Sequence, residues 1–352
     1  MRGWAMIGVI WAHAIPWYLA PDRLNLAGFI DYRIRHPIVS NGHLGVNVFF
    51  ILSGFVLALP YLDGRRSFSE PGALRTFYRR RAERLLPLYY VAMFVGMFVR
   101  VESDYTSFGF VKELFLLATF GYTFFQVYFF PRFDMAMWSL AIEFWFSAMF
   151  PLILVGMKRR GFLVLWLLVP CLLVRIYGAS LFPDQQTPLN HVKDGIFGRL
   201  DDFVVGMVLC LIVTRQPSRS RVASFALLGA GFAVFGILCV AWNAVTLRQV
   251  PFSVTPYLHT LTQLGTGLLL LGLVGDLPTP VRFVFTAWPI QLVGMMCYSI
   301  YVWHPMGQLG SAWSRSALPV YLAFIFTLAA LSYRFIEFPR RSFRDLFMSY
   351  PK

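Results

Sequence analysis

Arg2 and His13 are the ionisable side chains of an otherwise apolar opening stretch, "MRGWAMIGVIWAHAIPWYLA". In an α-helix, eleven residues place the two on nearly one face, about 16 Å apart along the axis. If this helix spans a bilayer, Arg2 lies at one surface and His13 near the midplane, where an ionisable residue is costly and usually functional. A structural role for His13 stays open, and so does a secretory signal peptide with an A-x-A at 12–14.

A polar stripe interrupts a second apolar segment, "MWSLAIEFWFSAMFP", in which Ser139, Glu143 and Ser147 recur at intervals of four residues. Residues at i and i+4 lie on one face of a helix. Ionisable residues inside a predicted span are costly and usually functional, so Glu143 is a candidate catalytic residue. Alternatively, Glu143 pairs with an arginine and holds the helices together.

Two more polar groups occur in apolar surroundings. The stretch "GRLDDFVVGM" places Arg199, Asp201 and Asp202 at a predicted helix start, and "CYSIYVWHPMG" places His304 before Pro305. The proline removes a backbone hydrogen bond and opens or kinks its helix. In the alternative interpretation, the two aspartates only favour their helix N-terminus, and His304 is a core histidine with satisfied hydrogen bonds.

An arginine cluster, "FYRRRAERLLPLYY", carries Arg79, Arg80, Arg81 and Arg84 at the start of the third apolar segment. Arg81 and Arg84 share a helix face. Guanidinium groups bind phosphates through bidentate, charge-assisted hydrogen bonds. The cluster is therefore a candidate binding site for a phosphorylated donor, and it can equally be a topological anchor at the membrane surface.

The composition is that of a membrane protein. Of the 352 residues, 58% are hydrophobic and 14% are charged, whereas soluble domains are about 45–50% apolar and about one quarter charged. The net charge of +14 could indicate nucleic acid binding, but the basic residues collect between apolar runs, as the positive-inside rule requires. We therefore expect a lipid bilayer and no nucleic acid as partner. The four cysteines read as buried thiols, and the six histidines show no metal-ligand spacing, so no metal is expected.

The apolar runs predict an all-α bundle of about ten transmembrane spans in one domain, 1–352. The segment 63–84 holds seven arginines and is predicted to be cytoplasmic. Both termini are then cytoplasmic, provided that the apolar stretch 110–130 is re-entrant or packed against the bundle. The predicted spans are 2–20, 44–62, 83–101, 138–157, 161–179, 199–214, 222–242, 257–275, 290–311 and 316–337.

This orientation puts Glu143, Asp201 and His304 in the outer half of the membrane and His13 at its centre. We therefore expect an outward-opening polar cavity with His13 at its floor. A donor held at the cytoplasmic arginines and an acceptor in the cavity would meet near His13, whose neutral imidazole can act as a general base.

The chain resembles the integral-membrane acyltransferase 3 family. Seven stretches carry the resemblance, in order and over nearly the whole chain. They are "RGWAMIGVIWAHA", "GHLGVNVFFILSGFVLALPY", "RRRAERLLPLYY", "WSLAIEFWFSAMFPLI", "GRLDDFVVGM", "CYSIYVWHP" and "EFPRR". The chain departs from the family pattern in beginning at Met1-Arg2 and in having Asn47 where an aspartate is common.

The resemblance implies transfer of an acyl group, commonly acetyl, from cytoplasmic acyl-coenzyme A to a hydroxyl of a glycan, lipid or small natural product. It implies a catalytic role for Arg2 and His13, and donor binding by Arg81 and Arg84, which Arg80 adjoins. Glu143 and His304 match recurring polar positions of the family. Ser139, Arg199, Asp201 and His304 are then the candidates for binding the acceptor or lining its cavity.

Two functions of other classes compete with this enzyme. Intramembrane His, Glu and Asp also occur in proton-coupled transporters, although the paired repeats of many carriers are not evident here. The fold could also serve as a non-catalytic exporter subunit for a cell-envelope glycan. In each case we expect a multi-pass protein of the bacterial cytoplasmic membrane, and binding of coenzyme A separates the enzyme from its competitors.

Overall fold

Helices make up every regular element that the computed structural model describes. It describes residues 1–18, 41–99, 107–131, 134–181, 190–216, 219–246, 248–305 and 318–340. The ends of the predicted spans 2–20, 83–101 and 290–311 and the start of 316–337 therefore lie outside the described residues. The longer helices are α1 (Arg2–Tyr18), α3 (Leu44–Leu62), α4 (Ala73–Val99), α5 (Ser107–Ala118), α6 (Met137–Arg160), α7 (Leu168–Leu181), α8 (Ile196–Arg215), α9 (Arg221–Thr246), α10 (Thr255–Val274) and α14 (Leu318–Ser332).

Five helical segments of the described chain are long and apolar enough to cross a membrane, or six if a bent pair counts as one span. They are Asn41–Leu62, Met137–Leu181, Arg221–Val245, Phe252–Val274 and Leu318–Glu337, and the bent pair is Thr279–Met295 with Cys297–Trp303. The chain is thus a multi-pass membrane protein. The count of ten spans and the placement of the termini stay predictions. One reason for the difference is that 138–157 and 161–179, predicted as two spans, are counted together as the 45-residue stretch Met137–Leu181, although α6 ends at Arg160 and Gly161 has a non-helical backbone with φ 58°.

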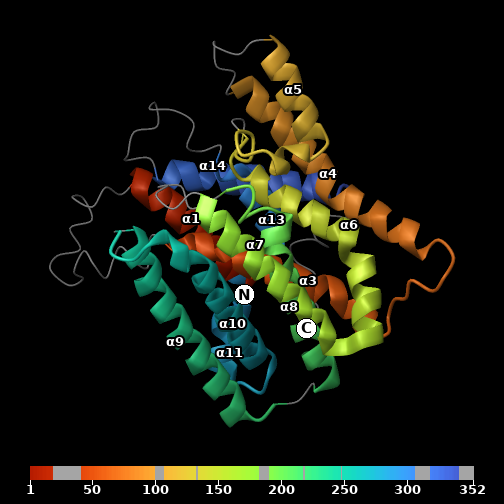
Figure 1. Cartoon of the computed structure of the whole chain (residues 1–352), viewed down its shortest axis with the longest axis vertical. Coiled ribbons are helices and arrows are strands. Elements are labelled where there is room, and N and C mark those ends of the chain that lie inside the picture. Colours follow the sequence, from red (N-terminus) through yellow and green to blue (C-terminus); the bar gives the residue numbers. More distant parts are fainter. Residues whose placement is uncertain are drawn as a thin grey trace.

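Helix α5 has 12 residues, about 18 Å at 1.5 Å per residue, which is too short for a hydrocarbon core of about 30 Å. It lies against α4, where the hydroxyl groups of Tyr89 and Tyr90 donate to the carbonyl oxygens of Leu117 and Ala118 at 2.8 and 3.0 Å. Figure 1 shows the two helices as an arm at one end of the molecule.

Glycines allow α3 and α8 to pack closely at the centre of the bundle. A Cβ atom at Gly206 of α8 would lie 1.9 Å from the carbonyl oxygen of Ile51 in α3. Reciprocally, a Cβ atom at Gly54 of α3 would lie 2.1 Å from the carbonyl oxygen of Phe203 in α8. Small residues at such crossings let membrane helices approach backbone to backbone. This contact fixes α8, which carries Arg199 and Asp201, against the middle of α3.

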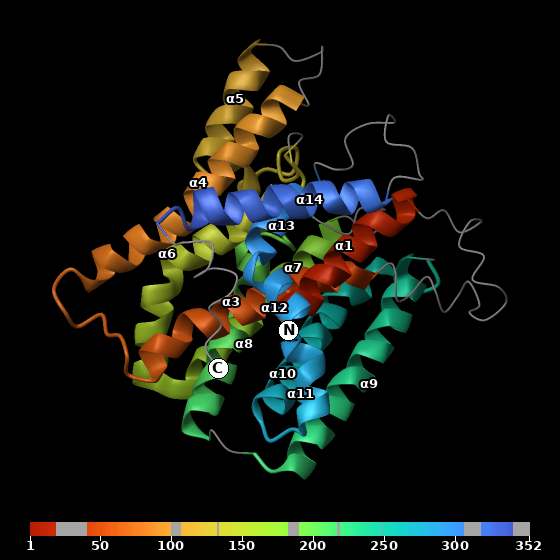
Figure 2. The same ribbon diagram turned by 180° about the vertical axis from the view of Figure 1, so that it is seen from behind.

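Helix α1 packs against α3 and α12 (Trp288–Met295), and α13 (Cys297–Trp303) packs against α14. Figure 2 shows α1, α13 and α14 together from behind. These contacts favour a permanent helix of the bundle over a signal peptide for α1. They also bring the His13 end of α1 close to the C-terminal end of α13, where His304 begins the next turn.

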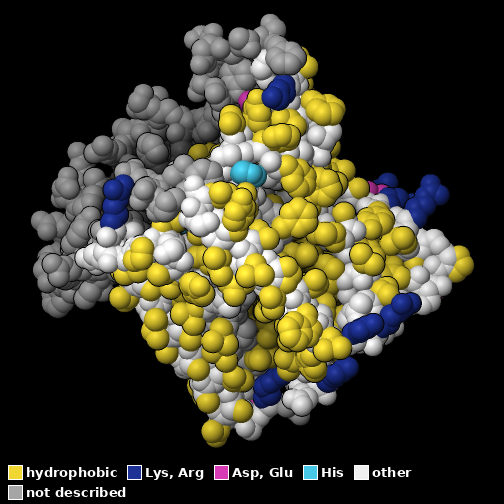
Figure 3. Space-filling model, in the orientation of Figure 1, with side chains coloured by type: hydrophobic (Ala, Val, Ile, Leu, Met, Phe, Trp, Pro, Cys, Tyr) yellow, Lys and Arg dark blue, Asp and Glu magenta, His cyan; other side chains and the backbone are white. Residues whose placement is uncertain are grey.

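The surface agrees with a membrane location. In Figure 3 hydrophobic side chains cover most of the visible face, and Lys and Arg side chains gather along one edge. Large apolar residues such as Leu152, Trp166 and Val240 are between 66% and 77% exposed. Exposed apolar patches of this extent mark a face that contacts another apolar medium, which lipid supplies.

Candidate functional site

His13 and His304 meet in one cavity. Their ring centroids are 4.9 Å apart and the rings are inclined at 69°. Both line a cavity of about 210 Å³, which we call the histidine cavity. His304 is buried. The structure thus brings together two histidines that are separated by nearly the whole chain.

Backbone hydrogen bonds fix which nitrogen of each ring carries the proton when the ring is neutral. Nδ1 of His13 lies 2.8 Å from the carbonyl oxygen of Val9, and Nδ1 of His304 lies 2.6 Å from that of Tyr301. A carbonyl oxygen only accepts, so each Nδ1 donates its proton. The lone pair of each neutral ring is then on Nε2, the atom through which a histidine oriented in this way can act as a base.

One wall of the histidine cavity is polar and comes from three elements. Arg199 of α8, Lys193 in the segment before α8, and His259 of α10 all line it. Nε2 of His259 donates to the Asp202 carboxylate at 3.1 Å, while Nδ1 lies 2.6 Å from an Nη atom of Arg199. Asn47 also donates to this Nδ1, at 3.0 Å. His259 is thus held as a neutral ring by partners from α3 and α8.

Neither His259 nor Arg175 is among the site residues predicted from the sequence. Each is a polar residue in a predicted span, which is itself a signal of a buried partner or a function. Asn47 was noted only as a departure from the family pattern. In the structure its amide completes the hydrogen bonding of His259.

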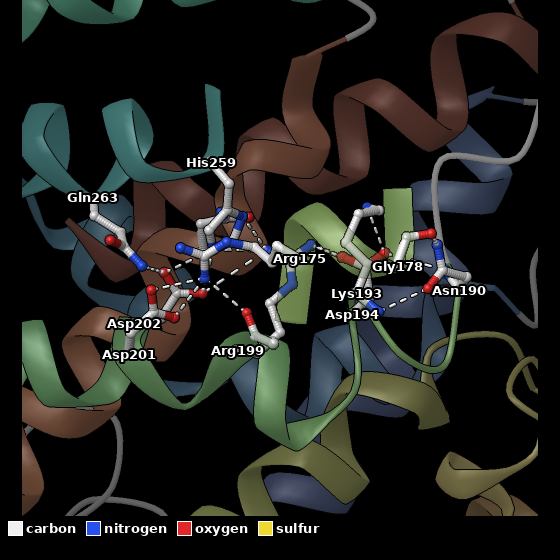
Figure 4. A network of polar contacts seen from close by, with 12 residues as sticks. Arg175, Gly178, Asn190, Lys193, Asp194, Arg199, Asp201, Asp202, His259 and Gln263 are labelled. Carbon is white, nitrogen blue, oxygen red and sulfur yellow. Dashed lines mark hydrogen bonds and ion pairs between the residues drawn. The ribbon is translucent and has the colours of Figure 1, made fainter. Parts of the chain in front are cut away.

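A charge network lies behind this wall (Figure 4). Arg175 of α7 is buried, donates to Asp201 at 2.8 Å and also bonds the carbonyl oxygen of Gly198. Asp194 accepts from Arg199 and, at 2.6 Å, from Lys193. Burial acts to raise the pKa of the Asp194 carboxyl, but the charges of Arg199 and Lys193 outweigh it and hold the pKa below its ordinary value.

Asp201 differs from its expected place. The sequence puts it on the cavity wall, whereas in the structure it is fully buried against Arg175. The physical reason is that an unpaired carboxylate in this interior would be costly, so it is paired with the guanidinium of the adjacent helix. The alternative in which Asp201 only favours a helix N-terminus also misses this partner.

Asp201, Asp202 and His259 could in principle hold a metal ion, because their ligand atoms lie within 4.8 Å of one another. Arg175 is 2.7 Å from Asp201, and His259 uses Nδ1 to accept from Arg199. A divalent cation would therefore have to displace guanidinium groups that already neutralise the carboxylates. The donor set suits arginine better than a metal.

Arg2 and Arg84 line a second pocket, which we call the arginine pocket. Ser53, Ser139 and Glu143 are among its polar lining residues. The same two arginines also line an adjoining pocket of about 380 Å³, with Gln291 and Tyr333 among the other residues of its wall. Arg2 therefore lies with Arg84 and not with His13, as the length of α1 requires.

Arg81 and Glu143 form an ion pair with an Nη–Oε distance of 3.0 Å. Arg81 also donates to Ser147 at 2.8 Å, and Ser53 donates to Glu143 at 3.4 Å. From the sequence, Glu143 is expected in the outer cavity with His304. The structure places it in the arginine pocket instead, because the arginines at the start of α4 attract the carboxylate of α6. Arg80, by contrast, is exposed.

Ser139 lines the arginine pocket and not the histidine cavity where it was expected. Its hydroxyl and that of Tyr301 are hydrogen-bonded at 2.7 Å. Tyr301 connects the two halves of the site, because it lines both the arginine pocket and the histidine cavity, as Val46 also does. The chain thus holds an arginine-lined pocket and a histidine-lined cavity that share one wall.

The chain is similar in sequence to known acyltransferases. A family model described as an acyltransferase domain matches residues 1–336. Peptidoglycan O-acetyltransferase OatA of Listeria monocytogenes is 26% identical over 353 residues, 94% of this chain and 56% of that protein. YrhL of Bacillus subtilis, a candidate peptidoglycan O-acetyltransferase, is 28% identical over 89% of this chain and 52% of its own length.

A candidate O-acetyltransferase of Staphylococcus aureus strain COL is 25% identical over 90% of this chain and 56% of its own length. The chain therefore spans about half the length of the curated relatives it matches. No solved structure matches it.

Proposed function

Because the chain belongs to the acyltransferase 3 family, we propose that it is a membrane O-acetyltransferase that moves an acetyl group from acetyl-coenzyme A to a hydroxyl of a cell-envelope glycan. The observation that carries the proposal is the shared wall between the arginine pocket and the histidine cavity. A donor and an acceptor can approach this wall from opposite sides and react beside His13.

The arginine pocket and its 380 Å³ neighbour suit the donor. Coenzyme A is a large polyanion, and Arg2 and Arg84 line both pockets. Guanidinium groups bind phosphate oxygens in bidentate fashion. Arg81 is already paired with Glu143, so we assign phosphate binding to Arg84 and Arg2 and a positioning role to Arg81. The exposed Arg80 lines neither pocket and is then a surface charge.

The histidine cavity suits a sugar. Trp138, Trp242 and Phe130 provide aromatic walls, and Arg199 and Lys193 provide hydrogen-bond donors. Sites for small ligands typically combine such apolar walls with a few well-placed polar groups. Peptidoglycan O-acetyltransferases among the relatives favour a glycan over a lipid as the acceptor.

The reaction follows from the orientation of His13. Nε2 takes the proton of the acceptor hydroxyl as the hydroxyl oxygen bonds to the thioester carbonyl carbon. The carbon–sulfur bond then breaks, and the departing thiolate takes this proton from Nε2 of His13. The products are the acetyl ester and coenzyme A. His304, whose ring lies 4.9 Å away, helps to orient the imidazole of His13 and the acceptor.

We further propose that the arginine side faces the cytoplasm and the histidine cavity faces outward. Positively charged residues accumulate on the cytoplasmic side of membrane proteins, and acyl-coenzyme A is cytoplasmic. The large anionic donor then never has to cross the membrane, since only its acetyl end reaches the shared wall. About ten spans with both termini inside remain the topology that fits this scheme.

Two variants test the function, one expected to lose acetyl transfer and the other to lose donor binding. In His13→Ala, acetyl transfer to an oligosaccharide acceptor should fall by about 10²–10⁴-fold, the usual contribution of a general base, with unchanged acetyl-coenzyme A binding. In Arg84→Ala, binding should weaken by about 1.5–3 kcal/mol, the value of a hydrogen bond to a charged group. Calorimetric titration and product analysis on protein in nanodiscs measure both effects.

Arg80→Ala is the matched control, because it removes an exposed arginine of the same helix, and it should bind the donor as the wild type does. If the wild-type protein does not bind acetyl-coenzyme A, the enzymatic proposal fails. The proton-coupled transporter and the exporter subunit would then be the functions to pursue. If the wild type binds acetyl-coenzyme A and transfers the acetyl group, and Arg84→Ala binds the donor equally well, only the assignment of Arg84 fails.

A further inference from the structure

Tyr301 stands between the two cavities of the site. It is 7% exposed and lines the arginine pocket on one side and the histidine cavity on the other. Val46 is the other residue that lines both. A donor in the arginine pocket and an acceptor beside His13 are therefore separated by one aromatic ring and one valine side chain.

The ring of Tyr301 is held from three directions. Its hydroxyl is bonded to that of Ser139 on α6 at 2.7 Å. Its ring centroid is 5.1 Å from that of His304 and 6.2 Å from that of Phe49 on α3. Its carbonyl oxygen accepts from Nδ1 of His304. The backbone is thus tied to the histidine, while one hydrogen bond between hydroxyls ties down the phenol.

This arrangement would let the side chain move without disturbing His304. The main chain of Tyr301 belongs to α13, and the contact with Ser139 is a hydroxyl–hydroxyl bond to a different helix. A single neutral hydrogen bond contributes little net free energy. An acceptor that contacts Tyr301 in the histidine cavity, with a donor already beside Ser139, would therefore open the wall and leave the imidazole of His304 in place.

We propose that the Tyr301–Ser139 pair is a barrier that keeps water of the histidine cavity away from the bound thioester until donor and acceptor are both present. The proposal rests on the function proposed above. A closed barrier prevents a wasteful reaction in which the oxygen of water bonds to the thioester carbonyl carbon. In that reaction the carbon–sulfur bond breaks, the thiolate takes one proton of the water, and acetate and a second proton are released.

Hydrolysis of acetyl-coenzyme A in the absence of any acceptor tests the barrier. Protein in nanodiscs is mixed with acetyl-coenzyme A, and the free thiol of coenzyme A is followed with a colorimetric thiol reagent in the bulk solution. Tyr301→Phe and Ser139→Ala remove the same hydrogen bond. Each should raise hydrolysis about fivefold, the factor that corresponds to a bond of about 1 kcal/mol, and the double variant should rise no further than either single one.

Tyr301→Ala removes the ring as well and should raise hydrolysis further than Tyr301→Phe. Tyr89→Phe is the matched control: its buried hydroxyl bonds Leu117, and Tyr89 lines neither cavity. It should hydrolyse acetyl-coenzyme A as slowly as the wild type. Donor binding is titrated for every variant, so that a loss of folding is not mistaken for a closed barrier.

Wild-type rates of hydrolysis in both Tyr301→Phe and Ser139→Ala, with normal donor binding, would overturn the barrier even if Tyr301→Ala does not fold. Different rates in these two variants would overturn the role of their shared hydrogen bond. A wild-type protein that neither binds nor uses acetyl-coenzyme A would instead overturn the proposed function. The two failures are therefore distinguishable.

Discussion

Removing Glu143 should destabilise the fold more than removing Glu143 and Arg81 together. The two side chains form an ion pair at 3.0 Å, with exposures of 16% for Arg81 and 22% for Glu143. At this distance and an effective dielectric constant of about 20, the attraction is about 5 kcal/mol, part of which desolvation cancels. Glu143→Leu leaves the guanidinium without its counter-charge, because Ser147 is then its remaining polar partner among the contacts described here.

Loss of one partner of a buried pair costs about 3–5 kcal/mol. Water reaches this pair in part, so we expect about 2–3 kcal/mol for Glu143→Leu and for Arg81→Met. The double variant buries two apolar side chains instead of two charges and should lose at most about 1 kcal/mol. The coupling free energy from the double-mutant cycle is then at least about 3 kcal/mol.

Denaturant unfolding in detergent micelles, followed by tryptophan fluorescence, measures each free energy. The control cycle uses Arg79→Met and Glu83→Leu, a pair on α4 with a distance of 3.7 Å and exposures of 70% and 63%. Its coupling should stay below about 0.5 kcal/mol. Additive losses at Arg81 and Glu143 would refute the structural role of the pair. A stable double variant without any acetyl transfer would show that the reaction needs the pair in addition to its structural role.

Three more outcomes follow from the packing and the proposed orientation. Gly206→Ala should cost about 1–3 kcal/mol through overpacking, since the new Cβ would lie 1.9 Å from a carbonyl oxygen of α3; unchanged unfolding would show that the helices can separate without cost. Arg175→Met should cost about 3–5 kcal/mol because it leaves the fully buried Asp201 unpaired, whereas Arg175→Met with Asp201→Leu should recover most of the loss. In a cysteine-free variant, an impermeant thiol reagent should label Gln249→Cys in intact cells and Ser69→Cys only after permeabilisation; the reverse pattern would invert the proposed orientation.

The sequence determined features that depend on one helix at a time. The apolar runs indicated a helical membrane protein, and the helical rise fixed Arg2 and His13 at separate depths of α1. That separation holds in the structure, where Arg2 lines the arginine pocket and His13 lines the histidine cavity. Local geometry of this kind follows from backbone hydrogen bonding alone, so one sequence was enough to predict it.

The tertiary structure decided which polar side chains are partners. Glu143 pairs with Arg81, Asp201 pairs with Arg175 of another helix, and His304 shares its cavity with His13. None of these pairings follows from spacing along the chain. The apolar surface of a helix can pack equally well against lipid or against any of several neighbouring helices. Where two helices dock is set by close contacts such as that of Gly206 with α3. An unpaired polar group is costly in a low-dielectric interior. Each buried polar side chain therefore pairs with a complementary group that the docked helices place close to it.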